Sequence, residues 1–258
     1  MEGIEEADPY GNYEWLASKR RKMEDVETIE ATKSPHIGPK SVYKFKLVIK
    51  SASDKRIYRV FTLANKMKIV LISDPDSVKS AAALSIQAGS MSDPKEFPGM
   101  AHLCERMLFA GNSSVTNSDE TCFETFLQKY DGEYTSYTQK DLAVHVFDVN
   151  PAAFHASLDR FARYFICPTF PRNSLEEEVD GIQAECDSRA ANDEDRRALV
   201  AALLTKADHP FSRFDCGNKE TLWNKPLKEG SVDTLSTLTI PTKLFLDGGN
   251  LLTVLCNS

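Results

Sequence analysis

Alternating apolar and polar residues mark several strands along the chain. The alternation begins near residues 42–47. The pattern then predicts strands in six further segments: residues 57–63, 67–73, 80–89, 133–137, 142–149 and 251–256. The first two of these six flank the short segment 64–66, which predicts a hairpin.

Between these strands, apolar residues recur at helical spacing. The predicted helices cover residues 99–109, 118–130, 150–165 and 173–204. Ser118 caps the second helix, and Asn150, followed by proline, caps the third. Asn173 with Glu176 three residues later forms a capping-box start for the fourth. We expect this last helix to break at Asn192 and Asp193.

Strand and helix groups alternate irregularly, which favours an α+β fold over a doubly wound sheet. We therefore predict an antiparallel sheet packed with helices. Residues 1–40 show no periodicity and are predicted to be a flexible leader, whereas residues 41–258 are predicted to form a single unit.

Composition limits the classes of function. The formal net charge of −7 argues against nucleic acid as a partner. No apolar run reaches about 18 residues, so we expect no membrane span. The acidic N-terminus has no secretory signal, and the six cysteines form no CxxC pair. We therefore expect a cytoplasmic protein with reduced, mostly buried thiols.

The helix at residues 99–109 carries one polar stripe in an apolar setting. His102, Glu105 and Arg106 project from nearly one face, because they are three and four residues apart. A lone His-x-x-Glu pattern is usually an ordinary surface pair. It also matches two of the three specified residues of the inverted zinc-peptidase (inverzincin) motif His-x-x-Glu-His, in which two histidines hold zinc and the glutamate activates water.

A zinc hydrolase needs about three protein ligands and a base near the metal-bound water. His102 can supply one ligand and Glu105 can act as the base. Another donor must come from elsewhere, and the acidic helix that contains Glu178 and Glu185 is the natural source. These two glutamates are seven residues apart, two turns along one face. One can bind the metal while the other hydrogen-bonds the ligands.

Ten collinear motifs sharpen this interpretation, at residues 73–75, 89–94, 99–105, 108–109, 147–149, 158–162, 167–168, 177–179, 209–214 and 217–219. Through these motifs the chain resembles the N-terminal part of the pitrilysin family of zinc metallopeptidases, in the branch of insulin-degrading enzyme and nardilysin. The resemblance runs from about Arg56 to Val254.

The resemblance implies that Glu185 is a zinc ligand and Glu178 a second carboxylate behind it. It also implies a unit related to pitrilysin and the mitochondrial processing peptidases, several of which form a clamshell around a peptide chamber. This chain is then the first unit only, and the missing C-terminal units, or a homologous subunit, are expected partners. The expected ligands are peptides and Zn2+, and apolar surface should be exposed where another unit would pack.

Two departures from the family pattern matter. Arg106 stands where the second zinc-binding histidine belongs, and a protonated guanidinium has no lone pair to donate. Held ~4 Å from a divalent ion, it would be repelled by about 8 kcal/mol at an effective dielectric constant near that of a protein surface. In addition, the family's substrate-binding edge strand carries a Ser-Asn-Ala type segment, whereas Tyr134, Thr135 and Ser136 stand here.

We therefore predict that Arg106 replaces the metal electrostatically by pairing with Glu105 and Glu185. The predicted function is a zinc metalloendopeptidase unit by ancestry that is now an inactive or impaired pseudoenzyme. The alternatives are an active zinc endopeptidase, in which another group completes the coordination, and a non-catalytic partner of a complete homologue.

Three other features are predicted to be structural. Cys104 and Cys186 are interpreted as core thiols and not as replacement ligands, and His145 as a half-buried strand residue. The phenylalanines at helical spacing in residues 154–165 are interpreted as core.

Overall fold

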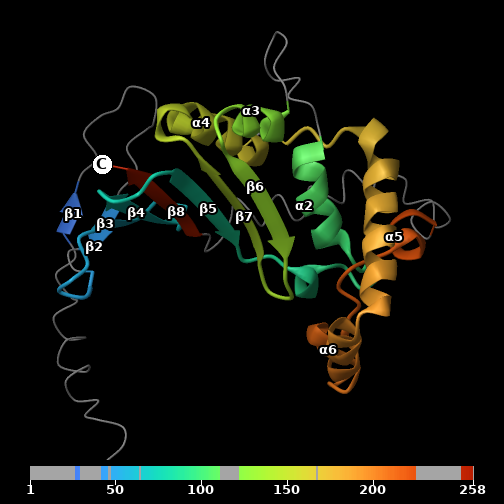
Figure 1. The fold of residues 1–258 in the computed structure, drawn as a ribbon. Coiled ribbons are helices and arrows are strands. Elements are labelled where there is room, and N and C mark those ends of the chain that lie inside the picture. The colour runs from blue at the N-terminus through green and yellow to red at the C-terminus, as the bar shows by residue number, and fades with distance from the viewer. Residues whose placement is uncertain are drawn as a thin grey trace, which may run out of the picture.

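One mixed sheet dominates the computed structural model, which describes residues 27–29, 42–45, 48–63, 65–110, 122–166, 168–224 and 251–257. Its eight strands lie in the order β1-β2-β3-β4-β8-β5-β7-β6 (Figure 1). Their bounds are β1 (Glu27–Ile29), β2 (Val42–Phe45), β3 (Ile57–Thr62), β4 (Lys68–Asp74), β5 (Ser80–Ile86), β6 (Glu133–Thr138), β7 (Ala143–Val149) and β8 (Leu251–Asn257).

The predicted α+β class and the sheet packed with helices are confirmed, with one difference in strand direction. Every neighbouring pair is antiparallel except β4 and β8, which are parallel. Strand β8 lies between β4 and β5, so Val254 pairs with Leu71 on one side and with Ala82 on the other. A central strand from a distant part of the sequence cannot be placed by local alternation.

Five α-helices accompany the sheet within the described residues: α2 (Met100–Ala110), α3 (Phe123–Lys129), α4 (Phe154–Ile166), α5 (Leu175–Ala191) and α6 (Asp193–Leu203). Helix α2 lies between β6 and α5, while α3 and α4 pack near it against the same half of the sheet (Figure 1). In both β5 and β7 every second residue is buried, as expected for strands covered closely on one face.

The core between sheet and helices is rich in aromatic rings. Phe154, Phe161 and Phe165 of α4 are buried there, which confirms that this stripe is core. Phe109 at the end of α2 contacts the rings of Phe161 and Phe165, so the helix that carries the candidate site is anchored by its apolar side.

Some predicted boundaries are wrong. Helix α5 begins at Leu175 and not at Asn173, because a 3₁₀ turn at Arg172–Ser174 precedes it and Ser174 takes the N-cap position. The strand predicted to reach residue 89 ends at Ile86. The predicted break at Asn192 is confirmed, since the side chain of Asn192 accepts hydrogen bonds from the N–H groups of Glu194 and Asp195.

Other predictions fall partly outside the described residues. The cap predicted at Ser118 lies among residues 111–121, which are not described, and the described helix begins at Phe123. Of the predicted leader, only β1 is described, and it pairs with β2.

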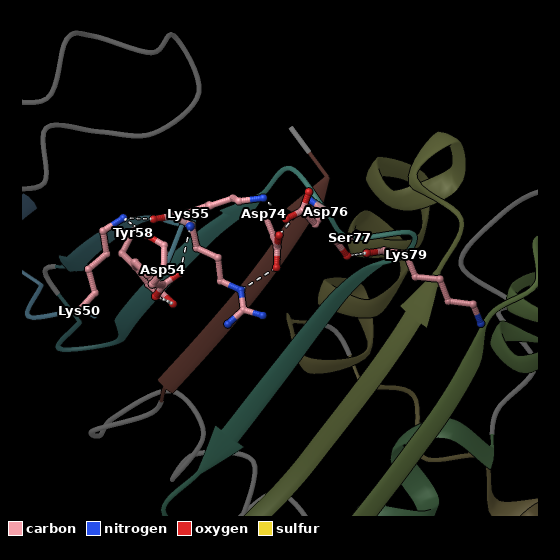
Figure 2. Close-up of polar contacts among 9 residues, drawn as sticks. Lys50, Asp54, Lys55, Tyr58, Asp74, Asp76, Ser77 and Lys79 are labelled. Carbon is pink, nitrogen blue, oxygen red and sulfur yellow. Dashed lines mark hydrogen bonds and ion pairs between the residues drawn. The ribbon is translucent and has the colours of Figure 1, made fainter. Parts of the chain in front are cut away.

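A group of charged side chains joins the start of β3 to the end of β4 (Figure 2). Arg56 Nε lies 2.6 Å from Asp74 Oδ2, and Asp74 Oδ1 accepts a 3.0 Å hydrogen bond from the N–H of Asp76. Lys55 also pairs with Asp76 at 3.2 Å. Because most of these groups face water, they fix the local turn more than they stabilise the fold.

Three further observations concern membrane-spanning helices, thiols and exposed apolar side chains. In the described parts of the chain, no helix has both the length and the apolar character needed to cross a bilayer. The described cysteines are all free, but only Cys104 and Cys216 are buried, whereas Cys122, Cys186 and Cys256 are partly exposed, so the prediction of mostly buried thiols is only partly confirmed. Aliphatic side chains at the end of α6 are exposed, with Leu203 at 64% and its C-cap residue Leu204 at 83%.

Candidate functional site

A cavity of about 510 Å³ opens between α2, α5 and the edge strand β6. The predicted site residues His102, Glu105, Arg106, Glu178, Glu185 and Ser136 all line it. The structure therefore brings together the two segments that the sequence interpretation paired, although they are far apart along the chain.

The start of α2 is fixed by a buried carboxylate and by two glycines in contact. Asp93 accepts hydrogen bonds of 2.7 Å from the N–H groups of Gly99 and Ala101, which satisfies two free donors of the first helical turn. Gly99 (φ +94°) lies against Gly217, and a Cβ on Gly99 would be 2.2 Å from the Cα of Gly217. This close approach places the Cys216 segment beside His102.

His102 is held between a backbone carbonyl and a carboxylate. Its Nδ1 lies 2.8 Å from the carbonyl oxygen of Cys216, and because that oxygen only accepts, Nδ1 carries the proton. Its Nε2 lies 3.3 Å from Glu185 Oε2. Burial opposes the imidazolium, but the contacts with Cys216 and Glu185 outweigh burial and raise the pKa of His102 to about 10. The same contact with His102 lowers the pKa of Glu185.

Glu105 points towards β6 and is only 7% exposed. Its Oε1 accepts a 2.6 Å hydrogen bond from the hydroxyl of Ser136, and its Oε2 accepts one from the hydroxyl of Thr138. Strand alternation puts Ser136 and Thr138 on the face towards α2, whereas Thr135 lies exposed on the opposite face. Of the two predicted substrate-strand residues, Ser136 therefore enters the cavity wall and Thr135 does not.

Arg106 contradicts the predicted pairing with Glu105 and Glu185. Its Nε donates a hydrogen bond of 2.7 Å to Glu178 Oε2. The guanidinium crosses α5 at Gly181, where a Cβ would lie 2.6 Å from Arg106 Nη2. Because Glu105 turns to the sheet and Glu185 to His102, Glu178 is the carboxylate left for Arg106.

Cys216 is a site residue that the sequence interpretation missed. Its buried Sγ, a carboxylate oxygen of Glu185 and a ring nitrogen of His102 all lie within 4.8 Å of one another. The residue is 114 positions from His102, and only its place beside the motif at residues 217–219 pointed to this region. Among the predicted core thiols, Cys104 is buried and Cys186 is partly buried.

His145 is fully buried and not half-buried as predicted. Its Nδ1 lies 2.8 Å from the hydroxyl of Tyr134, its ring packs against Phe109 and Phe165, and its Nε2 has no hydrogen-bond partner among the described residues. Burial lowers the pKa of His145 to about 3, so this imidazole is neutral at physiological pH. The residue supports the wall of the cavity from behind.

The donor chemistry of the cavity partly fits the zinc ion that the resemblance implies. His102 and Glu185 present suitable nitrogen and oxygen atoms close together, while Arg106 offers no lone pair. Two of the predicted ligands, His102 and Glu185, thus lie close together, whereas Arg106 stands at the sequence position of the third.

The chain is similar to several known proteins. Residues 68–209 match the family model Insulinase (Peptidase family M16). Human insulin-degrading enzyme is 38% identical over 183 residues, which cover 71% of this chain and 18% of that protein. A putative zinc protease of Caenorhabditis elegans is 34% identical over 187 residues, covering 72% of this chain and 22% of that protein.

Solved structures show the same architecture. The crystal structure of pitrilysin superposes with a TM-score of 0.73 and 28% identity, over 83% of this chain and 22% of that chain. The peptidase M16 inactive domain from Pseudomonas fluorescens shares the fold, with a TM-score of 0.66 and 19% identity over 78% of this chain and 47% of that chain.

The chain spans about a fifth of the length of the curated relatives described above. The family match covers more than half of the chain, and it includes both the helix that carries His102 and Glu105 and the helix that carries Glu178 and Glu185. On this basis, the chain belongs to the insulinase family, peptidase family M16.

Proposed function

We propose that this chain is a peptide-binding unit of the insulinase family in which zinc-dependent peptide hydrolysis is lost or strongly impaired. The observation that carries the proposal is the ion pair between Arg106 and Glu178 at the place where the motif requires an imidazole. A guanidinium cannot coordinate a metal ion, so one ligand of the ancestral set is gone.

The state of Glu105 supports the same proposal. A general base must contact the water whose proton it accepts. Both carboxylate oxygens of Glu105 already accept hydrogen bonds from Ser136 and Thr138. These hydroxyl groups compete with water for the lone pairs of Glu105, which reduces its use as a base.

The proposed ligand is an extended peptide. Strand β6 is at the edge of the sheet and forms one wall of the cavity. An edge strand has unpaired backbone N–H and C=O groups on its outer side, and an extended peptide can pair with them as an added strand. Peptide binding of this kind does not require the metal.

The proposal is tested with internally quenched peptides that fluoresce on cleavage, with and without a chelator. We expect no chelator-sensitive cleavage above the blank. Fluorescence anisotropy of labelled, uncleaved peptides should still show saturable binding. Chelator-sensitive turnover would contradict the loss of hydrolysis, and the absence of any peptide binding would contradict the binding role.

A second candidate, an active zinc endopeptidase, is favoured by the 3.3 Å approach of His102 Nε2 to Glu185 Oε2. Zinc, when bound, supplies a Lewis acid that polarises a peptide carbonyl. In this case Glu105 is the residue placed to accept a proton from water. The same cleavage assay separates this candidate from the first.

The third candidate is a non-catalytic subunit that pairs with a complete homologue. The exposed aliphatic residues of α6 favour it, because contiguous apolar surface is typical of protein–protein contacts. Co-purification with a tagged homologue, followed by size measurement, tests this candidate.

A further inference from the structure

Three donor atoms meet at one end of the cavity, and only two of them belong to the ligand set that the family resemblance implies. They belong to His102 on α2, Glu185 on α5 and Cys216 on the segment that follows α6. The atoms that His102, Glu185 and Cys216 offer are an imidazole nitrogen, a carboxylate oxygen and a thiol sulfur, all within 4.8 Å of one another. Each of these three atoms is an established zinc ligand.

The spacing of the first two donors suits a metal ion. Two nitrogen or oxygen ligands of zinc at a tetrahedral angle lie roughly 3.3–3.4 Å apart. His102 Nε2 and Glu185 Oε2 are 3.3 Å apart. The sulfur lies within 4.8 Å of both atoms and must move closer to them to complete a tetrahedral site, in which zinc–sulfur bonds are longer than zinc–nitrogen bonds.

The surrounding contacts orient these donors. A metal-binding histidine usually donates its other ring N–H to a carbonyl or carboxylate, which directs the lone pair to the metal. His102 makes this contact through Nδ1, and its partner is the carbonyl of Cys216 itself. The packing of Gly99 against Gly217 fixes that same segment, so one short stretch both orients the imidazole and supplies the thiol.

Arg106 does not occupy the space between these donors. Its Nε is bound to Glu178, and its Nη2 lies over Gly181 on α5. Glu178 therefore neutralises the guanidinium close by, which weakens the repulsion that argued against a metal ion. A carboxylate and a thiolate together also carry two negative charges, which match a divalent cation.

We propose that Cys216 takes the place of the missing imidazole and that His102, Glu185 and Cys216 form a site for one thiophilic divalent cation, with Zn2+ as the physiological candidate. The site goes beyond the proposed function and does not depend on it, because an ion can be bound without hydrolysis. On binding, the thiol of Cys216 and the Nε2 of His102, which is protonated in its contact with Glu185, each release a proton to water.

Titration with Co2+ alone tests the site on the full chain, because cobalt reports its ligands through its absorption. We expect one equivalent to bind with a thiolate-to-cobalt charge-transfer band, and Zn2+ to displace it. Cys216→Ser should remove the band and weaken binding by at least about tenfold. The matched control is Cys256→Ser, a partly buried thiol on β8 outside the cluster, which should keep both the charge-transfer band and the affinity for Co2+.

A further variant separates lost coordination from lost folding. Cys216→Asp keeps an anionic ligand, so it should bind Co2+ without the charge-transfer band, and circular dichroism should match the wild type. The proposal is overturned if the wild type binds no Co2+, if it binds without the band, or if the band survives in Cys216→Ser. Peptide cleavage plays no part in these measurements, so their outcome tests the metal site independently of the proposed function.

Discussion

Single side chains decide the chemistry of the cavity. At position 106 a guanidinium follows the carboxylate of Glu105 and is bound by Glu178 at 2.7 Å. Both partners are partly buried, so removal of one leaves the other poorly solvated. We expect such a loss to reduce the free energy of unfolding by roughly 1–3 kcal/mol. Arg106 thus contributes to folding at a position where the family motif uses a metal ligand.

Arg106→His should strengthen zinc binding by at least about tenfold, because it restores an imidazole on the correct face of α2. The dissociation constant is measured by competition with a chromophoric chelator. Arg106→Lys is the control, since a protonated amine adds no ligand and should bind zinc as the wild type does. Equal affinity in all three proteins would refute the role assigned to position 106.

His145 makes the stability depend on pH. Its pKa is about 3 when folded, against an ordinary value of 6.5, so the unfolded chain takes up the proton first as pH falls. The stability is thus fully present above pH 6.5 and falls as the pH is lowered towards 3. At a pH 1.5 units below the ordinary value, the loss reaches about 2 kcal/mol.

His145→Phe should remove this contribution, so wild type and variant should diverge in their pH dependence between neutral pH and pH 5. Urea denaturation at both pH values gives the difference in the free energy of unfolding. Exposed His155→Gln is the control and should follow the wild type. The idea fails if His145→Phe and the wild type show parallel pH profiles.

At the scale of elements, the start of α2 is in direct contact with the segment that precedes the π-helical turn at Glu220–Asn224. Asp93 caps α2, and its backbone carbonyl accepts a 2.7 Å hydrogen bond from Arg213 Nη1. The contact between Gly99 and Gly217 completes the connection. The position of Cys216 relative to His102 therefore follows from the packing of two loops.

Gly217→Ala should reduce stability by roughly 1–3 kcal/mol. Its φ of +77° disfavours a side chain, and a Cβ there would lie 2.8 Å from both Gly99 Cα and Leu222 Cδ1. Thermal or urea unfolding measures the effect. Asp208→Ala, an exposed change in the preceding loop, should stay within about 0.5 kcal/mol of the wild type. Equal stability of the two variants would contradict the close packing described above.

Periodicity predicted the elements well, because each strand or helix is decided by neighbouring residues. It placed β6 and β7 and the helix break at Asn192 correctly. It did not predict the partner of Arg106, which is 72 residues away, or the thiol of Cys216. Spacing along a helix states which face a side chain occupies, whereas its contacts depend on how the other elements pack.

Across the whole molecule, the helices do not cover all apolar surface. Helix α6 follows α5, and its residues Leu199, Val200 and Leu203 are exposed together with its C-cap residue Leu204. The chain also matches only about a fifth of its relatives' length. Both facts support the proposal that another protein surface covers α6.

Leu203→Glu combined with Leu204→Glu should leave the stability within about 0.5 kcal/mol per site, because both side chains are exposed. Association with a tagged homologue should weaken, since charge is placed on the proposed contact. Co-purification and analytical ultracentrifugation measure this. Lys206→Glu, an exposed charge change just beyond α6, is the control. Unchanged association in the double variant would exclude α6 as the contact.

The place of β8 in the sheet has a consequence for synthesis. Residues 251–257 form the strand between β4 and β5, which precede them by more than 160 residues. Until β8 has been synthesised, β4 and β5 lack the strand that pairs with both of them. Their unpaired edges can then form hydrogen bonds with the wrong strand. A chain with this strand order should depend on chaperone protection of β4 and β5 until β8 has been synthesised.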